Sequence, residues 1–167
     1  GFYTVLFASI KNSIVYSFEP FKDTVKIQKN NLKLNKIKNV FLKPIGITSI
    51  RKQRDIYIDK ILSLPNNSLS LINLKELDSS KNFNQKIKLQ SFEKFCELNN
   101  INKVDFIKID VEGEEYEILY DIKNFLEKYK PLVYVEVHSL PLKNYENYDK
   151  DKKNLYPIFN LIKNDYE

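Results

Sequence analysis

The chain has 167 residues, of which 43% are hydrophobic and 29% are charged. This composition is typical of a globular domain and excludes a disordered chain. No apolar run is long enough to cross a bilayer, and the printed sequence opens without a secretory signal pattern. The formal net charge is +5, but the lysines are spread along the chain and interleaved with acids. We therefore expect a solvated surface and no nucleic-acid partner, with phosphate contacts at the basic stretch 22–43 as the alternative.

Cys96 is the only cysteine, so the chain cannot form an internal disulfide. It lies in an amphipathic helical pattern and is expected to be a small core residue, which fits a reducing, cytoplasmic location. The chain begins on Gly1 inside an apolar run and stops just after a helical pattern. We expect both ends to be cut from a longer domain.

The first part of the chain predicts a strand–helix–strand order. Residues 2–11 fit a strand or a helix. Three clearer elements follow, namely a strand at 14–18, a helix at 21–35 and a strand at 40–47. Pro44 lacks a backbone N–H, so it predicts an edge position or a bulge within the last of these strands.

The segment 48–90 is the least regular part of the chain, and we expect it to be an insertion over one end of the main sheet. Its apolar stretches predict short strands at 56–58, 69–74 and 86–90. A helix at 92–99 then leads into the most informative stretch, Val104–Glu115. That stretch predicts a strand covered on both faces, which ends in carboxylates and turns at Gly113 into a helix.

The second half predicts the same alternation. Residues 114–129 carry an apolar stripe at helical spacing and are the clearest helix, which Pro131 ends. A second buried strand is expected at 132–138, a polar loop at 141–154 and a last helix at 156–164. Helices alternating with strands predict an α/β fold with a mainly parallel sheet.

Polar side chains gather where the two later strands end. Lys108, Asp110 and Glu112 share one parity, and Glu136 and His138 repeat it on the next strand. Parallel strands end at the same edge of a sheet, and such sheets bind their ligands there. The side chains expected to meet at this edge are Asp110, Glu112, Glu136 and His138. We expect Lys108 to pair with Glu136 in a structural role, since a lysine inside an apolar strand needs a partner.

Four blocks of sequence resemble the FkbM-type S-adenosylmethionine-dependent methyltransferases and stand in that family's order. They are GFYTVLFA, VYSFEP, VDFIKIDVEGEEYEIL and KPLVYVEVHS, at 1–8, 15–20, 104–119 and 130–139. The resemblance implies a Rossmann-like class I methyltransferase sheet with helices on both faces. It also implies that the first strand and the last strands are missing, and that 1–167 is a single, partial domain. Gly1 stands for the last glycine of the family's cofactor loop, and Ser91–Phe95 departs from the Thr-Leu-Asp that relatives often carry.

The resemblance also assigns roles for a cofactor, S-adenosylmethionine. Glu19 would accept hydrogen bonds from the ribose. The alternative for Glu19 is a surface acid before a proline turn. Gly1 and Phe2 would lie beside the methionine moiety. Asp110 would stabilise the sulfonium or orient the acceptor hydroxyl. His138, the only histidine, would act as general base, with Asp110 as the competing base and a hydrogen-bonded rim residue as the structural alternative.

Glu112 would lie at the mouth of the cleft as a further catalytic group, and Glu136 would face the substrate. A divalent ion on Asp110, Glu112 and His138 is conceivable, but no metal is expected. The implied activity is O-methylation of a hydroxyl on a glycan or a small metabolite. The alternative is a binding or structural module that keeps the fold without catalysis.

Overall fold

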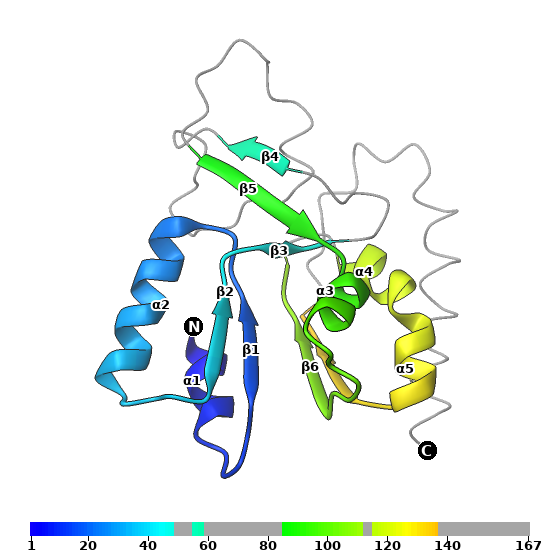
Figure 1. The fold of residues 1–167 in the computed structure, drawn as a ribbon, viewed down its shortest axis with the longest axis horizontal. Helices are drawn as coiled ribbons and strands as arrows, with labels where there is room; N and C mark the ends of the chain where they lie inside the picture. Colours follow the sequence, from blue (N-terminus) through cyan, green and yellow to red (C-terminus); the bar gives the residue numbers. More distant parts are fainter. Residues whose placement is uncertain (49–54, 59–84, 112–114, 137–167) are drawn as a thin grey trace.

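The structure, a computed structural model, describes residues 1–48, 55–58, 85–111 and 115–136. This part of the chain contains both helices and strands (Figure 1). They are α1 Phe2–Ala8, β1 Val15–Phe18, α2 Lys22–Leu34, β2 Val40–Lys43, β3 Gly46–Ile47, β4 Asp55–Ile58, β5 Gln85–Gln90, α3 Phe92–Leu98, β6 Phe106–Ile109, α4 Glu115–Asp121, α5 Lys123–Tyr129 and β7 Leu132–Val135. The predicted α/β class is confirmed.

The described strands form three small sheets. β1 pairs with β2 in parallel, from Val15 opposite Val40 to Phe18 opposite Lys43. β6 pairs with β7 in parallel, and β5 lies between parallel β3 and antiparallel β4. The prediction of mainly parallel pairing holds, but among these strands β1 and β6 are not hydrogen-bonded neighbours. The expectation of one continuous sheet is therefore not met in the described part of the chain.

The strand predicted at 40–47 is divided at Pro44. β2 ends at Lys43, the backbone N–H of Ile45 turns back to the carbonyl of Lys43, and β3 then pairs with β5 instead of β1. Proline cannot donate to a strand ladder, so the chain leaves the first sheet at this position. The predicted single strand is corrected to two.

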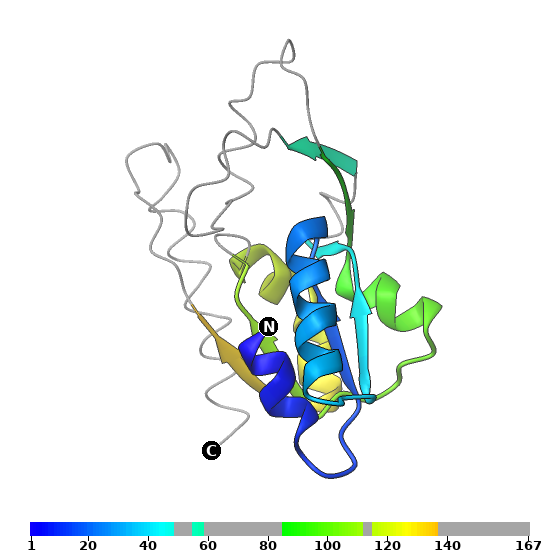
Figure 2. The same cartoon turned by 90° about the vertical axis from the view of Figure 1, so that its left-hand side faces the viewer.

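Residues 2–8 form a helix, which settles the ambiguity in their pattern. α1 lies on one face of β1, where the hydroxyls of Thr4 and Ser17 are 3.0 Å apart. α3 lies on the other face, where the ring of Phe95 meets Tyr16 and Phe18 edge-on. Successive strand side chains point to opposite faces, so β1 carries a helix on each side (Figure 2).

The main core lies between the β6–β7 pair and the later helices. Its buried residues come from α3, β6, α4 and α5: Phe95, Cys96, Ile109, Ile118, Leu119, Ile122, Phe125 and Leu126. The predicted helix at 114–129 is interrupted at Ile122, where ψ is 7°, although backbone hydrogen bonds continue through it from Ile118 to Leu126. The single helix is thus corrected to α4 and α5, which keep the predicted apolar stripe facing the core.

β7 is not buried on both faces, which corrects the prediction. Leu132 and Tyr134 are exposed, whereas Val133 and Val135 pack on the core. Strand β7 therefore has one covered face and one open face.

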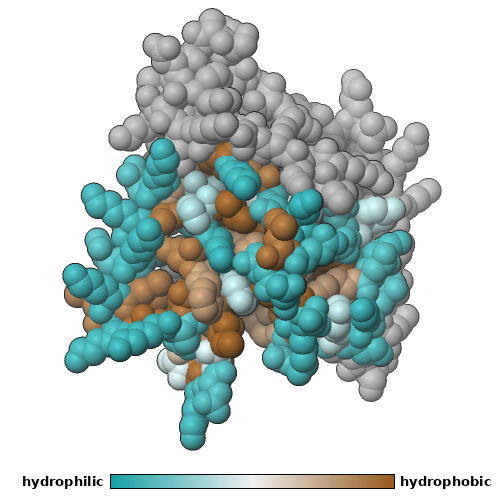
Figure 3. All heavy atoms as spheres, in the orientation of Figure 1, coloured by the Kyte–Doolittle hydropathy of each residue, from teal (hydrophilic) through white to brown (hydrophobic). Residues whose placement is uncertain are grey.

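Apolar side chains also reach the surface over β2 and α2, including Phe41 and Leu34 (Figure 3).

Several predicted elements lie outside the described residues: the strand at 69–74, the loop at 141–154 and the helix at 156–164. Within 48–90 the structure describes Thr48, β4 and β5, so the insertion stays a prediction. No helix among the described residues is long and apolar enough to span a membrane.

Candidate active site

Helix α1 runs opposite to β6 and brings its first turn to the carboxyl ends of the parallel strands. The ring of Phe7 lies 4.7 Å from that of Phe106 at the start of β6. The ring of Tyr3, one turn earlier, lies 4.5 Å from Nζ of Lys108 further along the same strand. The start of α1 therefore lies at the edge where parallel sheets place their ligand sites.

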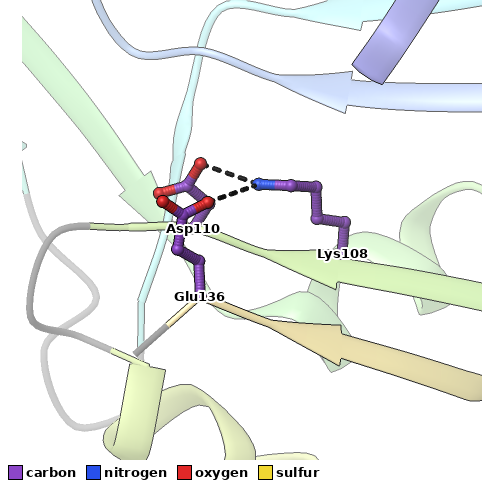
Figure 4. Close-up of polar contacts among 3 residues, drawn as sticks. All are labelled: Lys108, Asp110 and Glu136. Atoms are coloured by element: carbon purple, nitrogen blue, oxygen red, sulfur yellow. Dashed lines mark hydrogen bonds and ion pairs between the residues drawn. The ribbon is translucent and has the colours of Figure 1, made fainter. Parts of the chain in front are cut away.

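Three charged side chains meet at this edge (Figure 4). Nζ of Lys108 donates a 2.7 Å hydrogen bond to Oδ2 of Asp110 and lies 3.6 Å from Oε2 of Glu136. The predicted Lys108–Glu136 pair is present, but the closer partner is Asp110 on the same strand. Two carboxylates share one ammonium, so the group carries a formal charge of −1.

The burial of these three side chains differs. The Lys108 side chain is 12% exposed, whereas those of Asp110 and Glu136 are 37% and 47% exposed. The ammonium therefore lies at the base of the group, and the carboxylates face outward. A charge held this far from water depends on its partners, since an uncompensated buried ammonium is costly.

Two tyrosine rings flank the ammonium. Nζ of Lys108 lies 4.5 Å from the ring centre of Tyr3 and 5.8 Å from that of Tyr134. The two phenols interact with each other. Tyr3 contributes most to raising the pKa of Tyr134, desolvation and the negative charge of Glu136 add to it, and Lys108 acts in the opposite direction. The aromatic faces add cation–π attraction to the ion pairs.

Glu19 follows β1 and lies at the same edge. Its carboxylate accepts a 2.9 Å hydrogen bond from the backbone N–H of Phe21, the residue that caps α2. Burial raises the pKa of Glu19, and the hydrogen bond from the backbone N–H of Phe21 acts in the opposite direction. A half-buried carboxylate that still has accepting capacity is suited to hydrogen-bond donors of a ligand.

A buried glutamine supports this edge, and sequence reasoning missed it. Gln28 of α2 is 7% exposed, and a Cβ added to Gly1 would lie 2.9 Å from its Cγ. Oε1 of Gln28 accepts a 3.4 Å bond from Ser17, whose hydroxyl also meets Thr4. Its burial could have been predicted from its spacing, because Gln28 lies three residues after Val25 and therefore on the same, buried face of this lysine-rich helix.

The structure brings together some of the predicted site residues. Asp110 and Glu136 meet at Lys108, whereas Glu19 follows β1 and Gly1 packs against Gln28. Phe2 is 74% exposed and packs edge-on against Tyr3. Glu112 and His138 lie outside the described residues.

No group of three His, Cys, Asp or Glu side chains that could hold a metal ion occurs within residues 1–48, 55–58, 85–111 and 115–136. Because two of the three residues of the conceivable metal set, Glu112 and His138, are not described, that alternative is untested.

Comparison with known proteins identifies the family. The sequence model of the methyltransferase FkbM domain matches residues 1–153. This match covers most of the chain, so the protein belongs to the FkbM methyltransferase family, as its sequence blocks had indicated. A comparison with the curated proteins gave no match, nor did one with the solved structures.

Proposed function

We propose that this protein is an S-adenosylmethionine-dependent O-methyltransferase that acts on a hydroxyl of a glycan or a small metabolite. Membership of the FkbM family supports the methyl-transfer chemistry. The single structural observation that supports it is the acidic edge where Glu19 follows β1 of one parallel pair, and Asp110 and Glu136 follow β6 and β7 of the other. A net negative charge there fits a cofactor that carries a sulfonium and a ribose diol.

The cofactor, when bound, would supply a methyl group activated by the positive sulfur. Glu19 would accept hydrogen bonds from the ribose, and Gly1 and Phe2 would line the methionine part. Asp110 would stabilise the positive charge or orient the acceptor hydroxyl, and Glu136 would face the acceptor. The protein's contribution would then be mainly alignment of the reacting groups.

Proton removal from the acceptor hydroxyl needs a base. We propose His138 for this role, with Asp110 as the competing base and Glu112 assisting at the mouth of the cleft. General-base assistance contributes about 10²–10⁴-fold in rate. If the pH–rate profile is unaltered in His138→Ala, the base is another residue.

The first test is calorimetric titration of the chain with S-adenosylhomocysteine. We expect binding, and Glu19→Ala should weaken it about tenfold or more because a charge-assisted hydrogen bond is lost. Glu97→Ala, at an exposed position of α3, is the matched control and should bind as the unmodified chain does. Equal affinities in both variants would remove Glu19 from the cofactor site.

The second test concerns Asp110. Asp110→Asn should abolish methyl transfer from isotopically labelled S-adenosylmethionine to a panel of saccharides, while circular dichroism shows a folded protein. Retained transfer would exclude Asp110 from catalysis. If the unmodified chain binds neither cofactor nor product, the non-catalytic binding module becomes the better account.

We also propose that residues 1–167 act as a single methyltransferase-like domain in the cytoplasm. The support for a reducing compartment is the single cysteine, which is buried as a thiol in the core. Expression of a tagged chain and fractionation of the cells would test the location.

A further inference from the structure

Lys108 is the least exposed of the three charged side chains that meet at the ends of β6 and β7. Its Nζ is 2.7 Å from Asp110, 3.6 Å from Glu136 and 4.5 Å from the ring of Tyr3. The described groups around the ammonium come from three elements, with Tyr3 on α1, Asp110 at the end of β6, and Tyr134 and Glu136 on and after β7. The ammonium thus joins three segments that are distant in sequence.

In the described ion pairs, both carboxylates meet the same ammonium. The three side chains together carry a formal charge of −1, and the two carboxylates without Lys108 would carry −2. Any cation that approaches the carboxylates also meets the charge of Lys108. The electrostatic attraction of the edge for a positively charged ligand is therefore set by the lysine as much as by the acids.

The ring of Tyr3 contacts the ammonium of Lys108. Its ring is the nearer of the two aromatic faces, and it belongs to the same helix turn as Gly1 and Phe2, the residues proposed to line the cofactor. A cation–π contact in a partly desolvated position holds the ammonium near the ring and restrains its long, flexible stem. Movement of α1 would displace the ammonium relative to Asp110.

We propose that Lys108 is a positioning residue that sets the charge felt by the cofactor's sulfonium, and that Tyr3 holds its ammonium in place. This inference rests on the proposed function for the identity of the ligand. S-Adenosylmethionine carries the sulfonium charge and S-adenosylhomocysteine lacks it, while the rest of the two molecules is shared. The ratio of the two affinities therefore reports the charge of the site. A substitution that only disturbs the fold lowers both affinities and leaves their ratio unchanged.

The experiment measures both affinities by calorimetry for the full chain and its variants. Lys108→Met should raise the affinity for S-adenosylmethionine relative to S-adenosylhomocysteine about tenfold, because a charge that repels the sulfonium is removed. Lys108→Arg keeps the charge and should leave the preference within about twofold. Tyr3→Leu should shift the preference in the same direction as Lys108→Met, and Tyr3→Phe, which keeps the ring, should not.

Lys103 provides a matched control. Its Nζ also lies 2.7 Å from an aspartate two residues on, Asp105, but the two side chains are 74% and 82% exposed. Lys103→Met should change neither affinity, because solvent screens this pair. An unchanged ratio in Lys108→Met, or an equal change in Lys103→Met, overturns the inference.

A stability measurement tests whether Lys108 offsets the charge of the two carboxylates, and it needs no ligand. If the chain binds neither ligand, the proposed function is refuted, but this test of Lys108 still applies. In the unmodified chain, Asp110→Asn should lower the midpoint of urea unfolding because an ion pair is lost. In the Lys108→Met background the same substitution should raise the midpoint, because it relieves repulsion between two carboxylates. The same sign in both backgrounds would contradict the role assigned to Lys108.

Discussion

The hydroxyl oxygens of Thr4 and Ser17 lie 3.0 Å apart and join α1 to the middle of β1. Ser17 then donates to Oε1 of Gln28 in α2 at 3.4 Å. A short polar chain thus connects two helices across one strand, beside an otherwise apolar interior. Its last member packs against Gly1, so this chain of hydrogen bonds helps to place the start of α1 at the candidate site.

Ser17→Ala tests this polar chain. The substitution removes the donor to buried Gln28, and an unsatisfied buried acceptor costs about 1–3 kcal/mol. We expect a loss of unfolding free energy at the lower end of this range, measured by urea denaturation. Ser9→Ala removes an exposed hydroxyl that bonds the carbonyl of Leu6 and should change stability by less than about 0.5 kcal/mol. Equal losses in the two variants would show that the polar chain adds nothing.

Glu19→Gln should make the protein more stable near neutral pH. Burial raises the pKa of Glu19 above its ordinary value of 4.5 in the folded state. The neutral form therefore favours folding below that value, and its contribution is lost as the pH rises through the raised pKa. Glutamine keeps the neutral form and an oxygen that can accept from Phe21.

The measurement is the difference in unfolding free energy between variant and unmodified chain at pH 4 and pH 7. The gain should be present at pH 7 and small at pH 4. A gain that is larger at pH 4 would contradict the assigned direction.

Cys96 should resist thiol reagents in the folded protein. Its side chain is 5% exposed, and burial, with a further contribution from Glu93, raises its pKa to about 11. Thiolate is the reactive form, so alkylation by iodoacetamide at pH 8 should be slow until the protein unfolds. Mass spectrometry of samples treated with and without guanidinium measures this, and rapid labelling of the native protein would argue against the buried position.

Gly46→Ala should disrupt the junction between β3 and β5. A Cβ at this position would lie 2.6 Å from Cδ2 of Leu89, which is itself in the core. Overpacking of this kind costs about 1–3 kcal/mol. Because the clash is with one methyl group, adding Leu89→Ala should cost less in the Gly46→Ala background than in the unmodified chain. Additive losses in a thermal or urea unfolding series would contradict the clash.

The sequence predicted the class of the fold and the place of most described elements. β1, α2, α3 and the apolar stripe of α4 and α5 lie close to their predicted ranges because hydrophobic spacing is a local property. Parity along β6 also placed Lys108 beside Asp110. The assignment to the FkbM family is confirmed by the match of its domain.

Other features depend on contacts between distant segments, which local patterns do not encode. The divided strand at Pro44 was visible as a proline, but its new partner β5 was not. Lys108 was expected to form its ion pair with Glu136, but in the structure its nearer partner is Asp110. The ring of Tyr3 beside Lys108 and the burial of Gln28 arise only when α1 and α2 pack on the strands. The roles of Glu112 and His138 stay predictions.

The two parallel strand pairs are joined by side chains in the described part of the chain, since β1 and β6 share no backbone hydrogen bonds. Thr4 connects α1 to one pair, and Tyr3 and Phe7 connect it to the other. Contacts of α1 with both pairs therefore hold the end of β1, which leads to Glu19, in place relative to the end of β6, which leads to Asp110.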